Sequence, residues 1–105
     1  MFRDFFIGFV RIHILYHASR GPVYGLRLIE ELSRHGYRLS PGTLYPMLSR
    51  MERDGFLTSR KETESGRVRK YYRITGKGGN ALKEAKEKIG ELVNEVLSED
   101  RDKGR

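Results

Sequence analysis

The spacing of apolar residues changes at Gly55, and this change limits the folds open to the chain. Before Gly55, apolar side chains recur every three or four residues, which is the period of amphipathic helices. From Phe56 to Thr75 they alternate with polar ones around Glu64-Ser65-Gly66, which indicates two strands joined as a hairpin. The helical spacing returns after Gly79. The pattern predicts an α+β fold that is mainly α-helical, with one small β-hairpin before the last helix.

Three helices are predicted before the hairpin. The first spans about the first 20 residues and ends at Gly21-Pro22, and the second spans about Val23 to Arg34. Ser40 and Pro41 mark the start of the third, because a serine side chain can accept a hydrogen bond from a free amide there and a proline leaves no amide unpaired. Its core face is predicted from apolar residues at helical spacing, Leu44, Met47, Leu48 and Met51.

The first and last helices carry more apolar surface than a single small core can cover. In the first helix, Ile7, Val10 and Ile14 lie outside the apolar stripe that the other large residues form. In the last helix, apolar residues follow the three-and-four spacing of a coiled-coil seam. Burial within its own chain is the alternative for each helix, but the two surplus faces together favour a homodimer. The predicted dimer contacts are Phe2, Phe5, Phe6, Phe9, Leu82, Ala85, Ile89, Leu92 and Val96.

Positive charge concentrates on the predicted hairpin. The chain has 21 Lys and Arg residues against 14 Asp and Glu, a net charge of +7. Residues 58–78 contain 7 of the basic and 2 of the acidic side chains, so this segment supplies +5 of the total. In the second strand, Val68, Tyr72 and Ile74 should share a packed face that Lys70 interrupts, while arginines occupy the opposite face. Such a patch predicts a polyanionic partner, because phosphates attract clustered Lys and Arg side chains.

Composition and motifs exclude several classes of protein. The absence of cysteine excludes disulfides, thiolate metal sites and thiol nucleophiles, and it favours a reducing compartment, so we expect a cytoplasmic protein. Arg3, Asp4 and Arg11 interrupt the apolar N-terminal segment before it reaches the ~18 residues of a membrane span. No motif supports an enzyme, since Gly76-Lys77-Gly78-Gly79 matches neither common phosphate-binding loop and no serine lies in a nucleophile elbow.

His13 and His17 have the i,i+4 spacing of a two-histidine metal site on a helix. No acidic residue lies between them, and His35 is the one other histidine in the sequence. Our preferred interpretation is a pair of ordinary, partly buried histidines, so we predict no metal and no cofactor. An enzyme that holds zinc at this pair is the alternative.

Three helices followed by a basic hairpin is the element order of a winged helix-turn-helix. A third helix with a polar outer face can enter the major groove, where Arg bonds guanine edges and Ser, Thr or Tyr reach bases or phosphates. A solvated helix face is the alternative for Tyr45 and Arg50. The predicted DNA contacts are Ser40, Gly42, Thr43, Tyr45, Pro46, Ser49 and Arg50 from the helix, with Arg67, Arg69 and Lys70 from the hairpin.

Three sequence motifs follow one another along most of the chain. They are GPVYG at residues 21–25, SPGTLYPML at 40–48 continuing as MERDGFL at 51–57, and GRVRKYYRITGKG at 66–78. In this order they resemble the start of the second helix, the third helix with its turn, and the wing of the PadR family of transcriptional regulators. The resemblance covers about residues 5 to 97.

The resemblance implies a bacterial or archaeal dimeric repressor of the short branch, with a single C-terminal dimerisation helix. It also implies release from DNA when a small aromatic or drug-like molecule binds near the dimer interface. Leu26 occupies a position where the family usually has a tyrosine that contacts DNA, and Tyr24 is the candidate to replace it. The residues that would line the effector site are Phe5, Phe6, Phe9 and Tyr16.

From these observations we expect a winged helix-turn-helix domain over residues 1–78, a dimerisation helix over 79–98 and a charged tail over 99–105. The expected function is sequence-specific binding of double-stranded DNA by a homodimer, on an inverted-repeat operator with half-sites ~34 Å apart. The alternative is a winged-helix module that binds a ligand or a protein without binding an operator.

Overall fold

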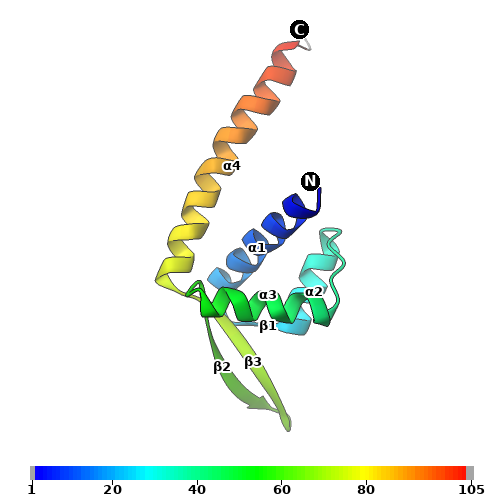
Figure 1. The fold of residues 1–105 in the computed structure, drawn as a ribbon, viewed down its shortest axis with the longest axis vertical. Helices are drawn as coiled ribbons and strands as arrows, with labels where there is room; N and C mark the ends of the chain where they lie inside the picture. Colours follow the sequence, from blue (N-terminus) through cyan, green and yellow to red (C-terminus); the bar gives the residue numbers. More distant parts are fainter. Residues whose placement is uncertain (1, 104–105) are drawn as a thin grey trace.

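The computed structural model describes the chain over residues 2–103, with side chains over residues 3–98. Helices α1 to α3 form a body, a hairpin extends from one side of it, and helix α4 leaves in the opposite direction (Figure 1). The predicted, mainly helical α+β fold is confirmed. The elements are α1 (Phe2–Arg20), β1 (Val23–Tyr24), α2 (Gly25–Arg34), α3 (Pro41–Arg53), β2 (Leu57–Glu64), β3 (Arg67–Ile74) and α4 (Gly76–Lys103).

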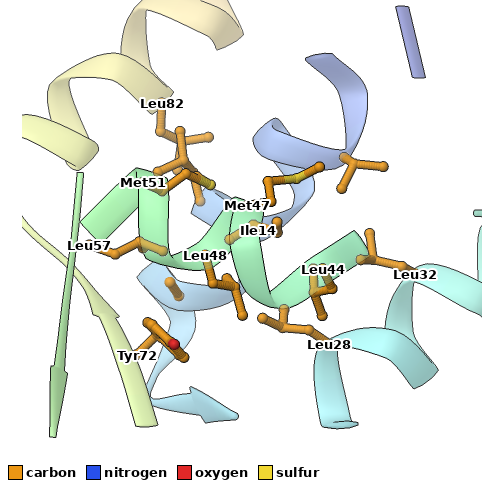
Figure 2. Packing of buried hydrophobic residues seen from close by; sticks show 13 residues of the cluster. Ile14, Leu28, Leu32, Leu44, Met47, Leu48, Met51, Leu57, Tyr72 and Leu82 are labelled. Atoms are coloured by element: carbon orange, nitrogen blue, oxygen red, sulfur yellow. The ribbon is translucent and has the colours of Figure 1, made fainter. Parts of the chain in front are cut away.

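Helix α3 lies at the centre of the core (Figure 2). The Ser40 Oγ accepts a hydrogen bond from the Thr43 amide at 3.3 Å and Pro41 occupies the first turn, as the start signals predicted. Burying one large apolar side chain contributes ~1.5–3 kcal/mol, so this cluster determines which face of α3 stays exposed. The buried residues are Leu44, Met47, Leu48 and Met51 of α3 with Val10, Ile14, Leu15, Ala18, Leu28, Leu32, Leu57, Tyr72 and Leu82.

A two-residue strand precedes α2, and the sequence prediction lacks it. Val23 pairs with Tyr72 and Tyr24 with Tyr71, so the strand order in the sheet is β1-β3-β2. Helix α2 therefore begins at Gly25 and not near Val23. So short a strand shows no alternation of its own, and it forms by pairing with a strand far along the chain. Periodicity could not reveal it.

The predicted hairpin is present, with a two-residue turn. Ser65 and Gly66 have φ angles of 51° and 77°, and two positive values are typical of the type I′ turn that matches the twist of paired strands. Leu57–Glu64 and Arg67–Ile74 are paired along their whole lengths. The hairpin is therefore a regular two-stranded ribbon up to its turn.

The inner face of β3 differs from the prediction toward the tip of the hairpin. Tyr72 is 3% exposed and Ile74 is partly buried, but Val68 is 66% exposed. The expectation that Val68 packs is wrong, because the hairpin extends past the helical body (Figure 1). The tip is therefore open to a partner on both of its faces.

Helix α4 begins against the core and then leaves it. Thr75 caps the start of α4: the Gly78 amide donates to Thr75 Oγ1 at 3.0 Å, and that hydroxyl donates to the Gly55 carbonyl oxygen at 2.6 Å. Leu82 is 6% exposed, so this side chain is buried within its own chain, and its predicted place in a dimer contact stays a prediction. From residue 86 to residue 97 all side chains of α4 are exposed.

The last part of α4 overlaps the predicted charged tail. The helix extends to Lys103, past the predicted end at residue 98, and the side chains of 99–105 lie outside the described residues. Among residues 2–103, no helix combines the length and the apolar character that crossing a membrane requires.

Candidate nucleic-acid interface

The polar side of α3 faces solvent along its whole length. The four apolar residues of the helix are buried, and helical geometry turns the remaining side chains outward. Every α3 residue predicted to contact DNA is exposed on this side, together with Ser40 at the N-terminus of the helix. These residues are Gly42, Thr43, Tyr45, Pro46, Ser49 and Arg50.

Tyr45 connects the outer face of α3 with the start of α2. The ring lies directly over Gly25, where a Cβ atom would be 2.7 Å from Tyr45 Cζ and still closer to Cε1. Tyr45 nevertheless remains 40% exposed, and the neighbouring Leu26 is 51% exposed. Glycine at this position therefore lets a half-exposed aromatic ring rest against α2 on the outer surface.

Arg69 lies over the ring of Tyr24, which a second aromatic ring contacts in turn. Its guanidinium carbon lies 4.4 Å from the centroid of the Tyr24 ring, a cation–π distance. The rings of Tyr24 and Tyr71 meet edge to face at 5.5 Å, and the Tyr71 hydroxyl donates to a Glu64 carboxylate oxygen at 2.9 Å. Because β1 pairs with β3, Tyr24 lies beside the hairpin. The sequence predicted Tyr24 as a candidate DNA contact but did not indicate this position.

Lys70 differs from the neighbouring arginines because it is paired with an acid. Its Nζ lies 3.3 Å from a Glu52 carboxylate oxygen and 5.5 Å from the centroid of the Tyr72 ring. The Ser59 hydroxyl donates to the other Glu52 oxygen at 2.5 Å. The hydrogen bond from Ser59, followed by Lys70, lowers the pKa of Glu52, and Glu52 in turn raises the pKa of Lys70.

Glu52 is a functional neighbour that sequence reasoning missed. It is the acidic residue of α3, and Lys70 breaks the apolar alternation on the strand face that turns toward α3. A cation on the packed face of a strand needs an anionic partner. Lys70 on that face and a single acidic residue on α3 were therefore the sequence signal that could have predicted the pair. The pairing reduces the charge that Lys70 can offer to a ligand.

A groove of about 380 Å³ lies between the start of α2, α3 and the hairpin. Three of its lining side chains are basic and, within the described residues, none is acidic. The structure thus brings together predicted DNA contacts from three separate parts of the chain. The lining residues are Tyr24, Gly25, Leu26, Tyr45, Arg67, Val68, Arg69 and Lys70.

Most of the predicted dimer contacts are exposed. Phe2 is named in the prediction, but its side chain lies outside the described residues. Ala85 is partly buried. Two further α4 residues that the prediction omitted, Val93 and Leu97, are exposed beside the seam. The exposed predicted contacts are Phe5, Phe6, Phe9, Ile89, Leu92 and Val96.

The aromatic residues proposed to line an effector site do not converge on one cavity. Phe6 meets the Tyr37 ring edge to face at 5.8 Å and lines an apolar cavity of about 500 Å³ with Met47. Tyr16 instead lines a separate cavity of about 280 Å³, together with His13, His17 and His35. This second cavity gathers the potential metal ligands, on a different part of the molecule from the basic groove.

Comparison with known proteins identifies the family of this chain. The model of the transcriptional regulator PadR-like family matches residues 14–84. The transcriptional regulator Rv3488 of Mycobacterium tuberculosis is 52% identical over 95 residues, covering 90% of this chain and 89% of that protein. The transcriptional regulator YqjI of Escherichia coli is 34% identical, covering 90% of this chain and 45% of that protein.

Solved structures agree with these matches. The PadR-like transcriptional regulator BC4206 of Bacillus cereus has a TM-score of 0.79 at 36% identity, covering 87% of this chain and 90% of that one. A PadR family regulator from Eggerthella lenta has a TM-score of 0.78 at 32% identity, covering 93% of this chain and 87% of that one. The chain is a transcriptional regulator that belongs to the PadR-like family.

Proposed function

We propose that this regulator is a homodimeric cytoplasmic repressor that binds an inverted-repeat operator in double-stranded DNA. The observation that carries the proposal is the basic groove that Tyr45 of α3 lines together with Arg67 and Arg69 of the hairpin. Recognition of a duplex needs one element for base edges and another for the backbone, and these two elements border the same groove.

Helix α3 and the hairpin have separate chemical roles in this proposal. Ser49 and Arg50 on the exposed face of α3 read base edges, and an arginine forms two hydrogen bonds to guanine in the major groove. Arg67 and Arg69 neutralise phosphates on the adjacent backbone. Lys70 contributes less than the arginines do, because Glu52 already pairs with it.

Exposed apolar surface on two helices supports the dimer. Phe9 on α1 is 49% exposed and Leu92 on α4 is 61% exposed, and water-facing side chains of this size in a row favour association with a second copy. Helix-turn-helix dimers bind half-sites ~34 Å apart, so in the proposed dimer we expect the two copies of α3 to enter successive major grooves.

A small aromatic ligand is the proposed releasing signal. The cavity of about 500 Å³ beside α1 has the size and apolar lining of small-molecule sites. It is bordered by Thr43 and Met47 of α3, so a ligand there would press on the helix that reads bases. Phe6 is the member of the predicted lining set that borders it, in edge-to-face contact with Tyr37, which also lines the cavity.

Titration of labelled duplexes at two salt concentrations tests the DNA-binding proposal. With an operator selected from random DNA, we expect Arg69→Ala to weaken binding to all duplexes alike and to flatten the salt slope by about one unit. Arg50→Ala should instead relax base preference at one position, costing ~1–3 kcal/mol of discrimination.

Lys88→Gln is the matched control, because it removes one charge from α4, on the far side of the body from the hairpin (Figure 1). It should leave both the salt slope and the base preference unchanged. Weak, sequence-blind binding by the native protein at every salt concentration would overturn the repressor proposal. That result would favour the module that binds a ligand or protein without an operator.

A further inference from the structure

Three histidines that are separated in the sequence meet beside the base of α4. His13 and His17 lie one turn apart on α1, and His35 is the C-cap residue that follows α2. The ring centroids of His13 and His35 are 4.8 Å apart, and those of His13 and His17 are 6.3 Å apart. One ring nitrogen from each histidine lies within 4.8 Å of the other two. These are all 3 histidines of the chain.

His17 carries a buried polar atom that lacks a partner among the described residues. Its Nε2 is enclosed by the fold and makes no hydrogen bond there. A buried ring nitrogen normally has a donor, an acceptor or a metal beside it, because leaving it unpaired costs free energy. The unpaired atom and the cluster of imidazoles therefore point to the same missing ligand.

We propose that His13, His17 and His35 together bind one divalent first-row transition metal ion, such as Zn²⁺. Imidazole nitrogens are preferred ligands of Zn²⁺, Ni²⁺ and Cu²⁺, whereas Mg²⁺ and Ca²⁺ prefer oxygen atoms. Zinc–nitrogen bonds of ~2.1 Å place tetrahedral ligand atoms ~3.4 Å apart, so nitrogens that lie within 4.8 Å of one another must approach by up to ~1.4 Å. The stacked rings of His13 and His35, with planes 21° apart, must also rotate so that their nitrogens point at one ion. Three protein ligands leave a position open to water.

The surroundings of the cluster carry charges of both signs. Glu31 on α2 acts on His17 through its negative charge, but Arg27 and Arg34 hold that carboxylate at 3.4 Å and 3.5 Å. Lys86 of α4 lines the same cavity and opposes the binding of a dication. The imidazoles thus provide the coordination, while the charged neighbours adjust the affinity.

A bound ion would connect two helices of the DNA-binding body and would lie beside a third. It would join α1 to the end of α2, immediately before residues 36–40 that lead into α3. Leu82 and Lys86 of α4 border the same cavity. Metal binding would therefore change DNA affinity, and this consequence rests on the proposed function, whereas the metal site itself does not.

Zinc titration of the full chain, freed of metal with a chelator and carrying no affinity tag, tests the site. We expect one Zn²⁺ per chain by calorimetry, with shifts of the ring signals of all 3 histidines in NMR spectra. His35→Asn should lower zinc affinity at least about tenfold. His35 is exposed at a helix end where asparagine is tolerated, so this variant should fold.

Lys86→Met is the matched control, since it keeps all three ligands and removes the opposing charge. It should bind zinc at least as tightly as the native chain. Absence of zinc binding, or equal affinity in the native chain and His35→Asn, would overturn the metal site. If zinc binds but leaves the DNA affinity of the native chain and of Lys86→Met unchanged, the regulatory consequence fails. If the native chain binds no operator at all, the proposed function fails, but the zinc titration still tests the metal site.

Discussion

At the scale of single residues, Glu52 stabilises the junction between α3 and the hairpin. It accepts a hydrogen bond from Ser59 on β2 and pairs with Lys70 on β3, so a single carboxylate joins both strands to the helix. The orientation of the hairpin relative to α3 decides whether base contacts and phosphate contacts can form together. Glu52 therefore acts on the interface by orienting the groups that line it.

Replacing Glu52 by Gln should lower the free energy of unfolding by ~1 kcal/mol at neutral pH, because the hydrogen bond and ion pair lose their charge. Folding lowers the pKa of Glu52 from its ordinary value of 4.5, so its contribution is fully present above that value. The contribution disappears as the pH falls through the lower, folded pKa. Urea unfolding of the native chain and the variant at pH 7 and at acid pH measures the difference between their unfolding free energies, which should become smaller at acid pH.

Glu30→Gln is the control for this experiment, because Glu30 is exposed on α2. It should change the unfolding free energy little at either pH. A stability difference for Glu52→Gln that stays the same across the acid range would contradict the assigned role of the carboxylate.

At the scale of elements, the joint between the sheet and α4 depends on a glycine. A Cβ on Gly78 would lie 2.7 Å from Ile74 Cγ1 and would overlap the Phe56 carbonyl oxygen. Backbone atoms cannot move aside as a flexible side chain can. The first turn of α4 thus sits directly against the segment that enters β2, and this contact sets the direction in which α4 leaves the body.

Gly78→Ala should destabilise the protein by ~1–3 kcal/mol, because the added methyl group meets backbone in a tightly packed place. Gly79→Ala, one residue along, has open space around the new Cβ and should stabilise α4 by ~0.5–1 kcal/mol through helix propensity. Thermal unfolding of the two variants measures the effects, which should have opposite signs. Equal effects would mean that the close approach at Gly78 does not restrain α4.

At the scale of the whole molecule, the chain is elongated. The chain measures 61 × 28 × 23 Å, and much of its length comes from α4 and the hairpin, which extend away from the core (Figure 1). A long helix with a row of exposed apolar residues is a costly arrangement for an isolated chain in water. A second copy that covers α4 would remove this cost.

Leu92→Glu should raise the dimer dissociation constant at least ~100-fold, because an unpaired charge would be buried twice in a symmetric interface. Asn94→Glu adds the same charge on another side of α4 and should leave the assembly intact. Sedimentation equilibrium of the native chain and both variants distinguishes them. A native chain that sediments as a monomer would contradict the proposed dimer.

Much of the fold was predictable because local signals were strong. The Ser40-Pro41 start, the apolar repeat from Leu44 to Met51 and the turn at Ser65-Gly66 each depend on near neighbours in the chain. The predicted assignments of DNA contacts and dimer contacts stay predictions, since they depend on partners that are not part of the chain itself. What could not be foreseen were pairings between distant segments.

The sequence by itself determined the helix order, the hairpin, the core face of α3 and the concentration of charge, because periodicity, capping and composition are local properties. Only the tertiary structure decided that Tyr24 joins the sheet, that Glu52 pairs with Lys70, that Leu82 is buried in its own chain and that His35 meets His13 and His17. These contacts join residues far apart in the chain. They form because packing of the shared core brings their elements together, which no local pattern encodes.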